Sequence, residues 1–472
     1  MRRLHAWAAT VSTTALAAAG CGGSSPAADA GPPPAWRRDL PPASAMGVRR
    51  GLTPARGLVH LHSPYSHDAC DGDPRPGGAP DETCLADLRL ALCTTHQDFA
   101  ALTDHDDSMA DEDFATLFSM RADDAAVIGP GGGPIASRIT CADGHQVLIT
   151  VGGENPLMPI MLDRHVDGDV ATRHDTYNAR DAAAITAMRE AGAKIWIPHT
   201  EQWTAADVRA VLPDGLEAYN LHANLDPDIR AEFLGLPASG AIAAVASFAD
   251  TNPDGPEPDL ALISFLEASQ PALDLWDALL GDGVRLAGTA GSDAHQNALP
   301  IMLRDGERGD SYRRVMRWFA NVVLVDDPSD PTAIEAALAG GRLFAAFEVL
   351  GTPVGFDVVA RTAGGASYEL GDVAPIGATL EVTVPTVWEL DPGLPTPQIR
   401  AIVYRVDGDG REVVADGAGP TLTVALDLPG AYRVEVRMTA RHLAPYLGNV
   451  GTAPAERELP WIYASPLYVG PQ

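Results

Sequence analysis

The feature that constrains the fold most is an alternation of short apolar runs with amphipathic stretches between Gly57 and Phe347. Strands that alternate with helices indicate an α/β architecture with parallel strands, and about seven such units favour a barrel over an open sheet. The clearest amphipathic stretches are 181–192, 204–212 and 260–283. The strand-like runs are 57–62, 99–106, 146–155, 194–200, 215–220, 285–295 and 321–325.

The pattern changes after about Gly351, where helical periodicity is lost. Runs such as 399–415 and 421–438 alternate apolar and polar residues, and Asp-Gly and Pro-Gly pairs separate them. This pattern predicts an antiparallel β-sandwich domain over 351–472, after a barrel domain over 56–350. The final run, 459–469, is expected to be a strand that packs back onto the core, so that the sandwich caps the barrel.

Polar residues gather at the carboxyl ends of the predicted strands, and in an α/β barrel those ends share one face. Residues two apart on a strand point to the same side, so two pairs can reach inward together. Imidazole and carboxylate side chains are the ligands of zinc, manganese and iron sites, and this set exceeds the needs of one metal. Two or three metals, bridged by a carboxylate, are expected. The residues are His60, His62, Asp104, His105, Asp106, Glu154, His199, Asp293 and His295.

The order and spacing of these residues resemble the polymerase and histidinol phosphatase (PHP) superfamily of metal-dependent phosphoesterases. The opening His-x-His element, followed five residues later by a further ligand, matches His60, His62 and His67. The Thr-Asp-His-Asp element matches 103–106, and Gly-x-Glu matches 152–154. The Pro-His and closing Asp-x-His elements match 198–199 and 293–295, and a histidine often found about eleven residues beyond the glutamate matches His165.

This resemblance, which covers roughly 57–350, implies a distorted (β/α)7 barrel of PHP type with a trinuclear site. Glu154 would bridge two metals. The implied cofactors are two or three divalent ions (Zn, Mn or Fe). The implied metal ligands are His60, His62, His67, His105, Glu154, His165, His199, Asp293 and His295.

The function that follows is a metal-dependent hydrolase, a phosphomonoesterase or phosphodiesterase that uses a metal-activated hydroxide at a di- or trinuclear site. Asp293 and His199 are the candidate catalytic residues for moving the proton. One alternative is a carboxyl-ester, carbamate or amide hydrolase on the same metal site. A second is a binding lipoprotein with a non-catalytic metal barrel.

The formal net charge of -30 bears on the partners. A field of that sign repels polyanions, so no nucleic-acid scaffold is expected. Divalent ions can still make the pocket locally attractive to an anion. The expected partner is therefore a small anionic or ester substrate.

The first residues are typical of export. A short basic region, 1–3, precedes an apolar run over 6–19, which predicts a signal peptide over 1–20. The stretch 18–21 resembles a bacterial lipobox and implies lipid on Cys21; an ordinary signal peptide that happens to contain a cysteine is the alternative. Residues 21–55, rich in Pro, Gly, Ala and Ser, are expected to be a flexible tether. The protein would then be an exported, membrane-anchored lipoprotein on the periplasmic side or cell surface, touching the membrane through that lipid only.

Four cysteines remain: Cys70, Cys84, Cys93 and Cys141. Because export implies an oxidising compartment, their even number suggests two disulfides, for which three pairings are possible. Pairing Cys70 with Cys84 would close a Pro/Gly-rich loop and leave Cys93 with Cys141. A cysteine metal site competes, but no pair shows the close spacing that zinc sites prefer.

Four further histidines, His96, His145, His174 and His222, are interpreted as ordinary polar residues. His174 and His222 lie near loops at the ligand-bearing end and could touch substrate.

Overall fold

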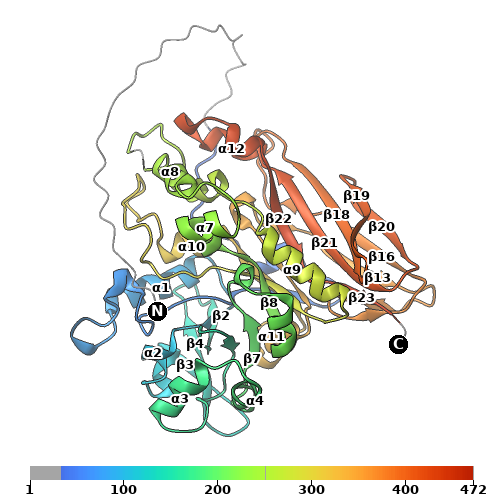
Figure 1. Cartoon of the computed structure of the whole chain (residues 1–472). Helices are drawn as coiled ribbons and strands as arrows, with labels where there is room; N and C mark the ends of the chain where they lie inside the picture. The colour runs from blue at the N-terminus through green and yellow to red at the C-terminus, as the bar shows by residue number, and fades with distance from the viewer. Residues whose placement is uncertain (1–32, 250, 471–472) are drawn as a thin grey trace.

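The computed structural model describes residues 33–249 and 251–470 and has a mixed α/β fold with a large central sheet (Figure 1). The predicted signal peptide and the lipidation site at Cys21 lie outside the described residues. Each predicted strand-like run overlaps a strand, although the first strand begins four residues before its run and shares only Gly57 and Leu58 with it. These strands are β1 (Thr53–Leu58), β2 (Phe99–Leu102), β5 (Gln146–Val151), β7 (Lys194–Ile197), β8 (Gly215–Asn220), β9 (Ala287–Gly291) and β10 (Ala320–Val325).

Two sheets carry the ligand-bearing half of the chain. In the large sheet β1, β2 and β5 are parallel neighbours, and in a four-stranded sheet β7, β8 and β9 are parallel neighbours. The short strand β6 (Met158–Ile160) pairs antiparallel with β7. Bridges between Leu61 and Ala294 and between Val151 and Leu162 link the two sheets at both sides. The carboxyl ends of the parallel strands therefore come to one face.

The direction of β10 departs from the prediction of parallel strands, because β10 pairs antiparallel with β1. All six residues of β10 are buried. A strand that is apolar on both faces shows no alternation from which its surroundings could be predicted. β11 (Leu343–Ala346) then pairs antiparallel with β10 and extends the sheet.

Each of the three predicted amphipathic stretches contains an α-helix, and the remaining α-helices lie outside these stretches. Two of these stretches contain α4 (Ala182–Glu190) and α5 (Ala205–Val211), and the third contains α9 (Gln270–Gly281). The first part of that third stretch forms a 3-10 helix, Pro258–Ser264. The other α-helices are α1 (Glu82–Thr94), α2 (Asp106–Met109), α3 (Val170–Tyr177), α6 (Leu221–Leu225), α7 (Pro227–Glu232), α8 (Gly240–Ala246), α10 (Tyr312–Trp318), α11 (Pro331–Ala339) and α12 (Ala453–Glu456).

A β-hairpin fills the segment between the second and third predicted strands. Strands β3 (Ala125–Ile128) and β4 (Pro134–Thr140) pair antiparallel, and β4 adds to the edge of β5. The glycine-rich run 129–133 makes the turn of this hairpin through the hydrogen bond from Gly129 N–H to the Gly133 carbonyl.

The C-terminal part is all-β except for α12 and short 3-10 turns. One four-stranded sheet has the order β14-β13-β16-β20, and further strands join the large sheet. Figure 1 shows these strands, in orange and red, gathered on one side with α9 beside them. The strands are β12 (Pro353–Val354), β13 (Asp357–Arg361), β14 (Ser367–Tyr368), β15 (Val373–Ala374), β16 (Ala378–Thr383), β17 (Thr386–Val387), β18 (Gln398–Asp407), β19 (Gly410–Gly417), β20 (Thr421–Leu426), β21 (Gly430–Thr439), β22 (Glu458–Ala464) and β23 (Leu467–Val469).

The two predicted regions share a sheet and a core. β22 lies between β11 and β21 and pairs antiparallel with both, so the run 459–469 does pack back onto the core. Trp461 at its centre is fully buried. On the other side, Asp277 of α9 accepts hydrogen bonds from buried Arg433 of β21. The hydrogen-bonded sheet therefore continues from the first predicted domain into the second.

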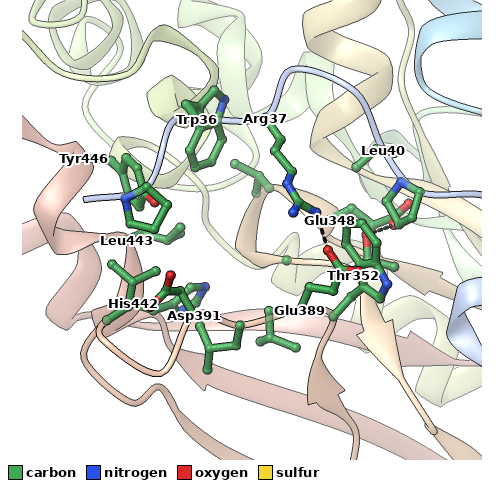
Figure 2. A pocket seen from close by; sticks show the side chains of 18 of the residues that line it. Trp36, Arg37, Leu40, Glu348, Thr352, Glu389, Asp391, His442, Leu443 and Tyr446 are labelled. Atoms are coloured by element: carbon green, nitrogen blue, oxygen red, sulfur yellow. Dashed lines mark hydrogen bonds and ion pairs between the residues drawn. The ribbon is translucent and has the colours of Figure 1, made fainter. Parts of the chain in front are cut away.

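The prediction of a flexible tether over 21–55 is wrong for the residues from Trp36 onward, and 21–32 lie outside the described residues. The Trp36 ring packs edge-on against Tyr446 at a centroid distance of 5.2 Å, and Arg37 Nη1 lies 2.6 Å from Glu389 Oε2 (Figure 2). Leu40 and Met46 are buried. Composition misled here because a few apolar side chains suffice to hold a Pro- and Ala-rich segment on the core.

A cavity of about 200 Å³ lies between this N-terminal segment and the C-terminal region (Figure 2). Its lining includes Trp36, Arg317, Trp388 and His442. In the described ranges, no helix combines the length and apolar character that a membrane crossing requires.

Candidate metal centre

Two groups of possible metal ligands meet where the parallel strands end. Each group offers ligand atoms that all lie within 4.8 Å of one another. The first group comprises His60, Glu154, His199 and Asp293, and the second comprises His62, Asp68, His105 and His295. Their positions follow from the strands: β1 precedes the two opening histidines, β2 precedes His105, β5 precedes Glu154, β7 precedes His199, and β9 precedes Asp293 and His295.

Glu154 joins the two groups. Its Oε2 lies 3.1 Å from His60 Nε2 and 3.2 Å from His62 Nε2, and its Oε1 lies 2.7 Å from His199 Nε2. The carboxylate is buried. A carboxylate that reaches ligands of both groups through its two oxygens has the geometry of a bridging ligand.

The second ring nitrogen of each of three histidines meets an oxygen that can only accept. His60 Nδ1 lies 2.6 Å from Glu217 Oε1, His105 Nδ1 lies 2.7 Å from the Glu154 carbonyl, and His295 Nδ1 lies 2.8 Å from the Asp293 carbonyl. Each Nδ1 must therefore carry the proton and donate it. Metal-binding histidines show this arrangement, because the partner fixes the ring and leaves Nε2 for the metal.

His62 reaches the same state through a hydroxyl. Its Nδ1 lies 3.1 Å from Ser66 Oγ, and Ser66 Oγ donates to Asp68 Oδ1 at 2.8 Å. Since the hydroxyl has one proton and gives it to Asp68, its lone pair accepts the Nδ1 proton of His62. Ser66 thus orients two members of the second group.

The unsatisfied atoms of the site fit divalent cations. Asp293 Oδ1 is buried, yet among the described residues it makes no hydrogen bond. It faces His60 Nε2 at 3.4 Å, His62 Nε2 at 3.4 Å and His295 Nδ1 at 3.3 Å. A buried carboxylate oxygen without a hydrogen bond is costly unless an ion neutralises it. Mixed imidazole and carboxylate donors suit zinc, manganese or iron.

The carboxylates and imidazoles of the site shift one another's pKa values in opposite directions. Burial would raise the pKa of Glu154 and Asp293, but the surrounding imidazoles outweigh it and hold both pKa values well below their usual range. Conversely, burial would lower the pKa of His105, but Asp68 and Glu154 raise it to about 10. His199 behaves likewise beside Glu154, with a pKa raised to about 9. Protons thus balance the carboxylates, and metal ions that bind there must displace them.

Two of the nine predicted ligands are not brought into either group. His67 is exposed, and its ring centroid lies 5.1 Å from that of His105, whereas the next residue, Asp68, joins the second group. His165 is buried elsewhere: its Nε2 lies 3.0 Å from the Glu112 carbonyl and its Nδ1 lies 3.2 Å from Tyr177 Oη. The structure therefore does not bring His165 into the ligand set, because both of its ring nitrogens have hydrogen-bond partners outside the two groups. The other seven lie in the groups.

Sequence reasoning assigned no ligand or positioning role to several residues that the structure brings to the site. Asp68 follows directly after a predicted ligand, and Glu217 is an acidic residue in the middle of a wholly buried strand, which is a usable signal. His222, interpreted as an ordinary polar residue that could touch substrate, has its Nδ1 3.0 Å from Asp293 Oδ2. His174 lies outside the groups and pairs with Asp106 at 2.7 Å.

The four cysteines form the disulfides Cys70–Cys84 and Cys93–Cys141, which is one of the three pairings considered. A cysteine metal site is thereby excluded. The first disulfide stands beside the second group, because Cys70 N–H donates to the His295 carbonyl at 2.9 Å. The cavity beside Trp36 is separate, since its lining contains none of the two groups' residues.

The chain matches no protein-family model and no curated protein. A similar solved structure is that of a two-domain protein from Bacteroides vulgatus, described as containing a predicted PHP-like metal-dependent phosphoesterase. The similarity covers 91% of this chain and 99% of that chain, at 14% identity and a TM-score of 0.33. A similarity this low carries no argument about the fold or activity of this chain.

Proposed function

We propose that the protein is a metal-dependent hydrolase that acts on phosphoesters and holds two or three divalent cations. The observation that carries the proposal is the pair of ligand groups joined by Glu154, in which His60, His62, His105 and His295 all have Nδ1 held by an acceptor. Ordinary buried histidines need no such common orientation. A site built so that several Nε2 atoms converge on carboxylates is built for cations.

Divalent cations in such a site lower the pKa of a nearby water and neutralise negative charge that develops on a phosphoryl group. The residues of the first group, His60, His199 and Asp293 with Glu154, would hold one cation. Those of the second, His62, Asp68, His105 and His295, would hold another. Because the chain has a net charge of -30, bound cations would supply the positive charge that attracts a small anionic substrate to this site.

We propose that Asp293 and the histidines beside it carry out the proton transfer of the reaction. Asp293 Oδ2 lies 3.0 Å from His222 Nδ1 and 3.6 Å from His199 Nε2. The His222 side chain is 43% exposed, whereas that of His199 is 18% exposed. His222 is therefore the better placed of the two to carry a proton from Asp293 to a leaving oxygen at the surface, and His199 is the better placed to stay a ligand.

The finer description of the fold and location belongs to the same proposal. The ring of neighbours β1, β2 and β5 to β9, closed by the two bridges, supports a distorted (β/α)7 barrel. The two sheets of the C-terminal part support a β-sandwich. The two disulfides support export to an oxidising compartment. Lipid attachment at Cys21 is proposed from the sequence 18–21 alone.

The test combines metal analysis with substrate panels. The full chain is stripped with a chelator and reloaded with zinc, manganese or iron, and it is assayed with phosphomonoesters and phosphodiesters and, in parallel, with carboxyl esters and carbamates. We expect phosphoester hydrolysis that returns with metal and is lost in His60→Ala. His145→Ala is the control, because that ring pairs with the Gln97 carbonyl away from the groups.

Two results would contradict the proposal. Loaded protein that is inactive on all phosphoesters, and that binds metal equally with and without His60, would refute the hydrolase. Activity confined to carboxyl esters or carbamates would keep the metal centre and replace the substrate class.

A further inference from the structure

Two buried groups that lack hydrogen bonds face each other beside the first ligand group. In the part of the chain that the structure describes, neither oxygen of the Glu201 carboxylate has a hydrogen-bond partner, and His199 Nδ1 has none either. The distance from His199 Nδ1 to Glu201 Oε1 is 3.8 Å. The Glu201 side chain is only 1% exposed. A buried carboxylate of this kind is expensive to keep in a fold without a purpose.

His199 is the exception among the five histidines of the two groups. The other four have Nδ1 held by an acceptor, as Glu217 holds His60. His199 Nε2 lies at the groups' centre, 2.7 Å from Glu154 Oε1, like the Nε2 atoms of the others. What His199 lacks is an acceptor behind it, and Glu201 is an acceptor that lacks a donor.

The local backbone already holds His199 and Glu201 on the same side, so side-chain rotation alone can bring His199 Nδ1 and Glu201 Oε1 together. His199 has a left-handed backbone conformation, with φ 46°, and precedes the 3-10 turn Thr200–Gln202. Its backbone N–H is already held by Glu217 Oε2 at 2.9 Å. The turn brings Glu201 back to the same side as the ring. About one ångström of approach, well within the range of small side-chain rotations, would turn the 3.8 Å contact into a hydrogen bond.

We propose that Glu201 is the positioning residue of His199. When Nε2 of His199 binds a cation, the imidazole keeps its proton on Nδ1 and donates it to Glu201 Oε1. The carboxylate then fixes the ring and makes Nε2 a better ligand. This inference rests on the proposed metal centre, and it adds a residue that neither the ligand pattern nor the ligand groups contain.

The test compares Glu201→Gln and Glu201→Ala with the wild type in the full chain. Zinc affinity is measured by competition with a chromophoric chelator, and stability by urea unfolding of the metal-free proteins. We expect Glu201→Ala to weaken zinc binding in the first group about ten- to hundredfold. Glu201→Gln should weaken it less, because the amide oxygen still accepts a hydrogen bond. Gln202→Ala, on the exposed side of the same turn, is the matched control and should bind as the wild type does.

Stability separates positioning from a purely structural role. Because the metal-free protein leaves the buried carboxylate unsatisfied, Glu201→Gln should unfold at the same or a higher urea concentration than the wild type while it binds zinc more weakly. Wild-type zinc affinity in Glu201→Ala would overturn the inference and leave the metal centre intact. Weaker zinc binding matched by an equal loss of metal-free stability in Glu201→Gln would overturn it too. Absence of zinc binding by the wild type would instead refute the metal centre itself.

Discussion

The Nε2 atoms of His60 and His62 lie 3.2 Å apart. On the opposite side of each ring, Glu217 and Ser66 accept the Nδ1 protons of His60 and His62. Neither ring can rotate to move its Nε2 away from the other without losing this hydrogen bond. Two lone pairs, or two N–H groups, at this distance repel each other, and a single shared proton or a cation removes the conflict. The His-x-His segment after β1 is thus held from behind by Glu217 of β8 and by Ser66 of the loop that follows.

Glu217 can be displaced without being mutated. A methyl group added at Gly291, in the neighbouring strand β9, would overlap the Glu217 carboxylate. We expect Gly291→Ala to push that carboxylate off His60 Nδ1 and to lower zinc affinity about ten- to hundredfold, as loss of a ligand's orienting partner does. Isothermal titration of the chelator-stripped proteins measures it. Gly131→Ala, at a hairpin turn with open space, is the control; unchanged affinity in Gly291→Ala would refute the role of Glu217.

The two disulfides are predicted to differ in their effect on metal binding, although both stabilise the fold. Cys70–Cys84 spans 14 residues and Cys93–Cys141 spans 48, so loop-closure entropy assigns them about 3 and about 4 kcal/mol of stability respectively. The first starts two residues beyond Asp68. Replacing Cys70 and Cys84 with serine should therefore lower both the unfolding free energy and the metal content, whereas replacing Cys93 and Cys141 should lower only the unfolding free energy. Urea unfolding and metal analysis test this; equal metal loss in both variants would contradict it.

Much of the fold was predictable because burial sets the pattern of each strand. The runs that contain β5, β8 and β9 were located from apolar character alone. Prediction failed where one sequence pattern is compatible with two strand directions. The apolar pattern of β10 fits a strand buried on both faces, and such a strand can be parallel or antiparallel to β1. The Pro- and Ala-rich residues before β1 failed for a related reason, because composition does not show that Leu40 and Met46 find a buried place.

The site was predictable to the extent that strand ends position side chains. His60, His199 and Asp293 each lie two positions beyond the last residue of a strand, and their places follow from parallel pairing. A loop sets the position of Asp68, and nothing in one sequence distinguishes it from its neighbour. Glu217 lies on β8, which pairs with β9, and it contacts His60 beyond the end of β1. Its role therefore depends on which strands are neighbours, and that information exists only in the assembled sheet.

His442 should make stability fall in mild acid. Its Nε2 donates to the Leu350 carbonyl at 3.0 Å, and burial outweighs this hydrogen bond and lowers its pKa to about 4. The folded protein therefore keeps it neutral, while the unfolded chain takes up a proton below about pH 6.5. The stability it supports is complete above that pH and is lost as the pH falls towards 4, up to about 3 kcal/mol.

The measurement is urea unfolding of chelator-stripped wild type and His442→Gln from about pH 7 to about pH 4.5, because glutamine has no such titration. The advantage of the wild type over the variant should shrink as the pH falls. A difference between the two that stays constant over this range would contradict the prediction.

The sharpest contrast within the site is between neighbours His67 and Asp68. The ligand pattern points to His67, but Asp68 Oδ2 lies 3.2 Å from His295 Nε2 and 3.5 Å from His105 Nε2, while His67 is exposed. We expect Asp68→Asn to lose about one equivalent of bound metal, because an amide oxygen carries no charge to offset a cation among imidazoles. His67→Ala should retain its metal and most of its activity. Elemental analysis after dialysis against trace chelator decides it: metal loss in His67→Ala with retention in Asp68→Asn would reverse the assignment and make His67 the ligand.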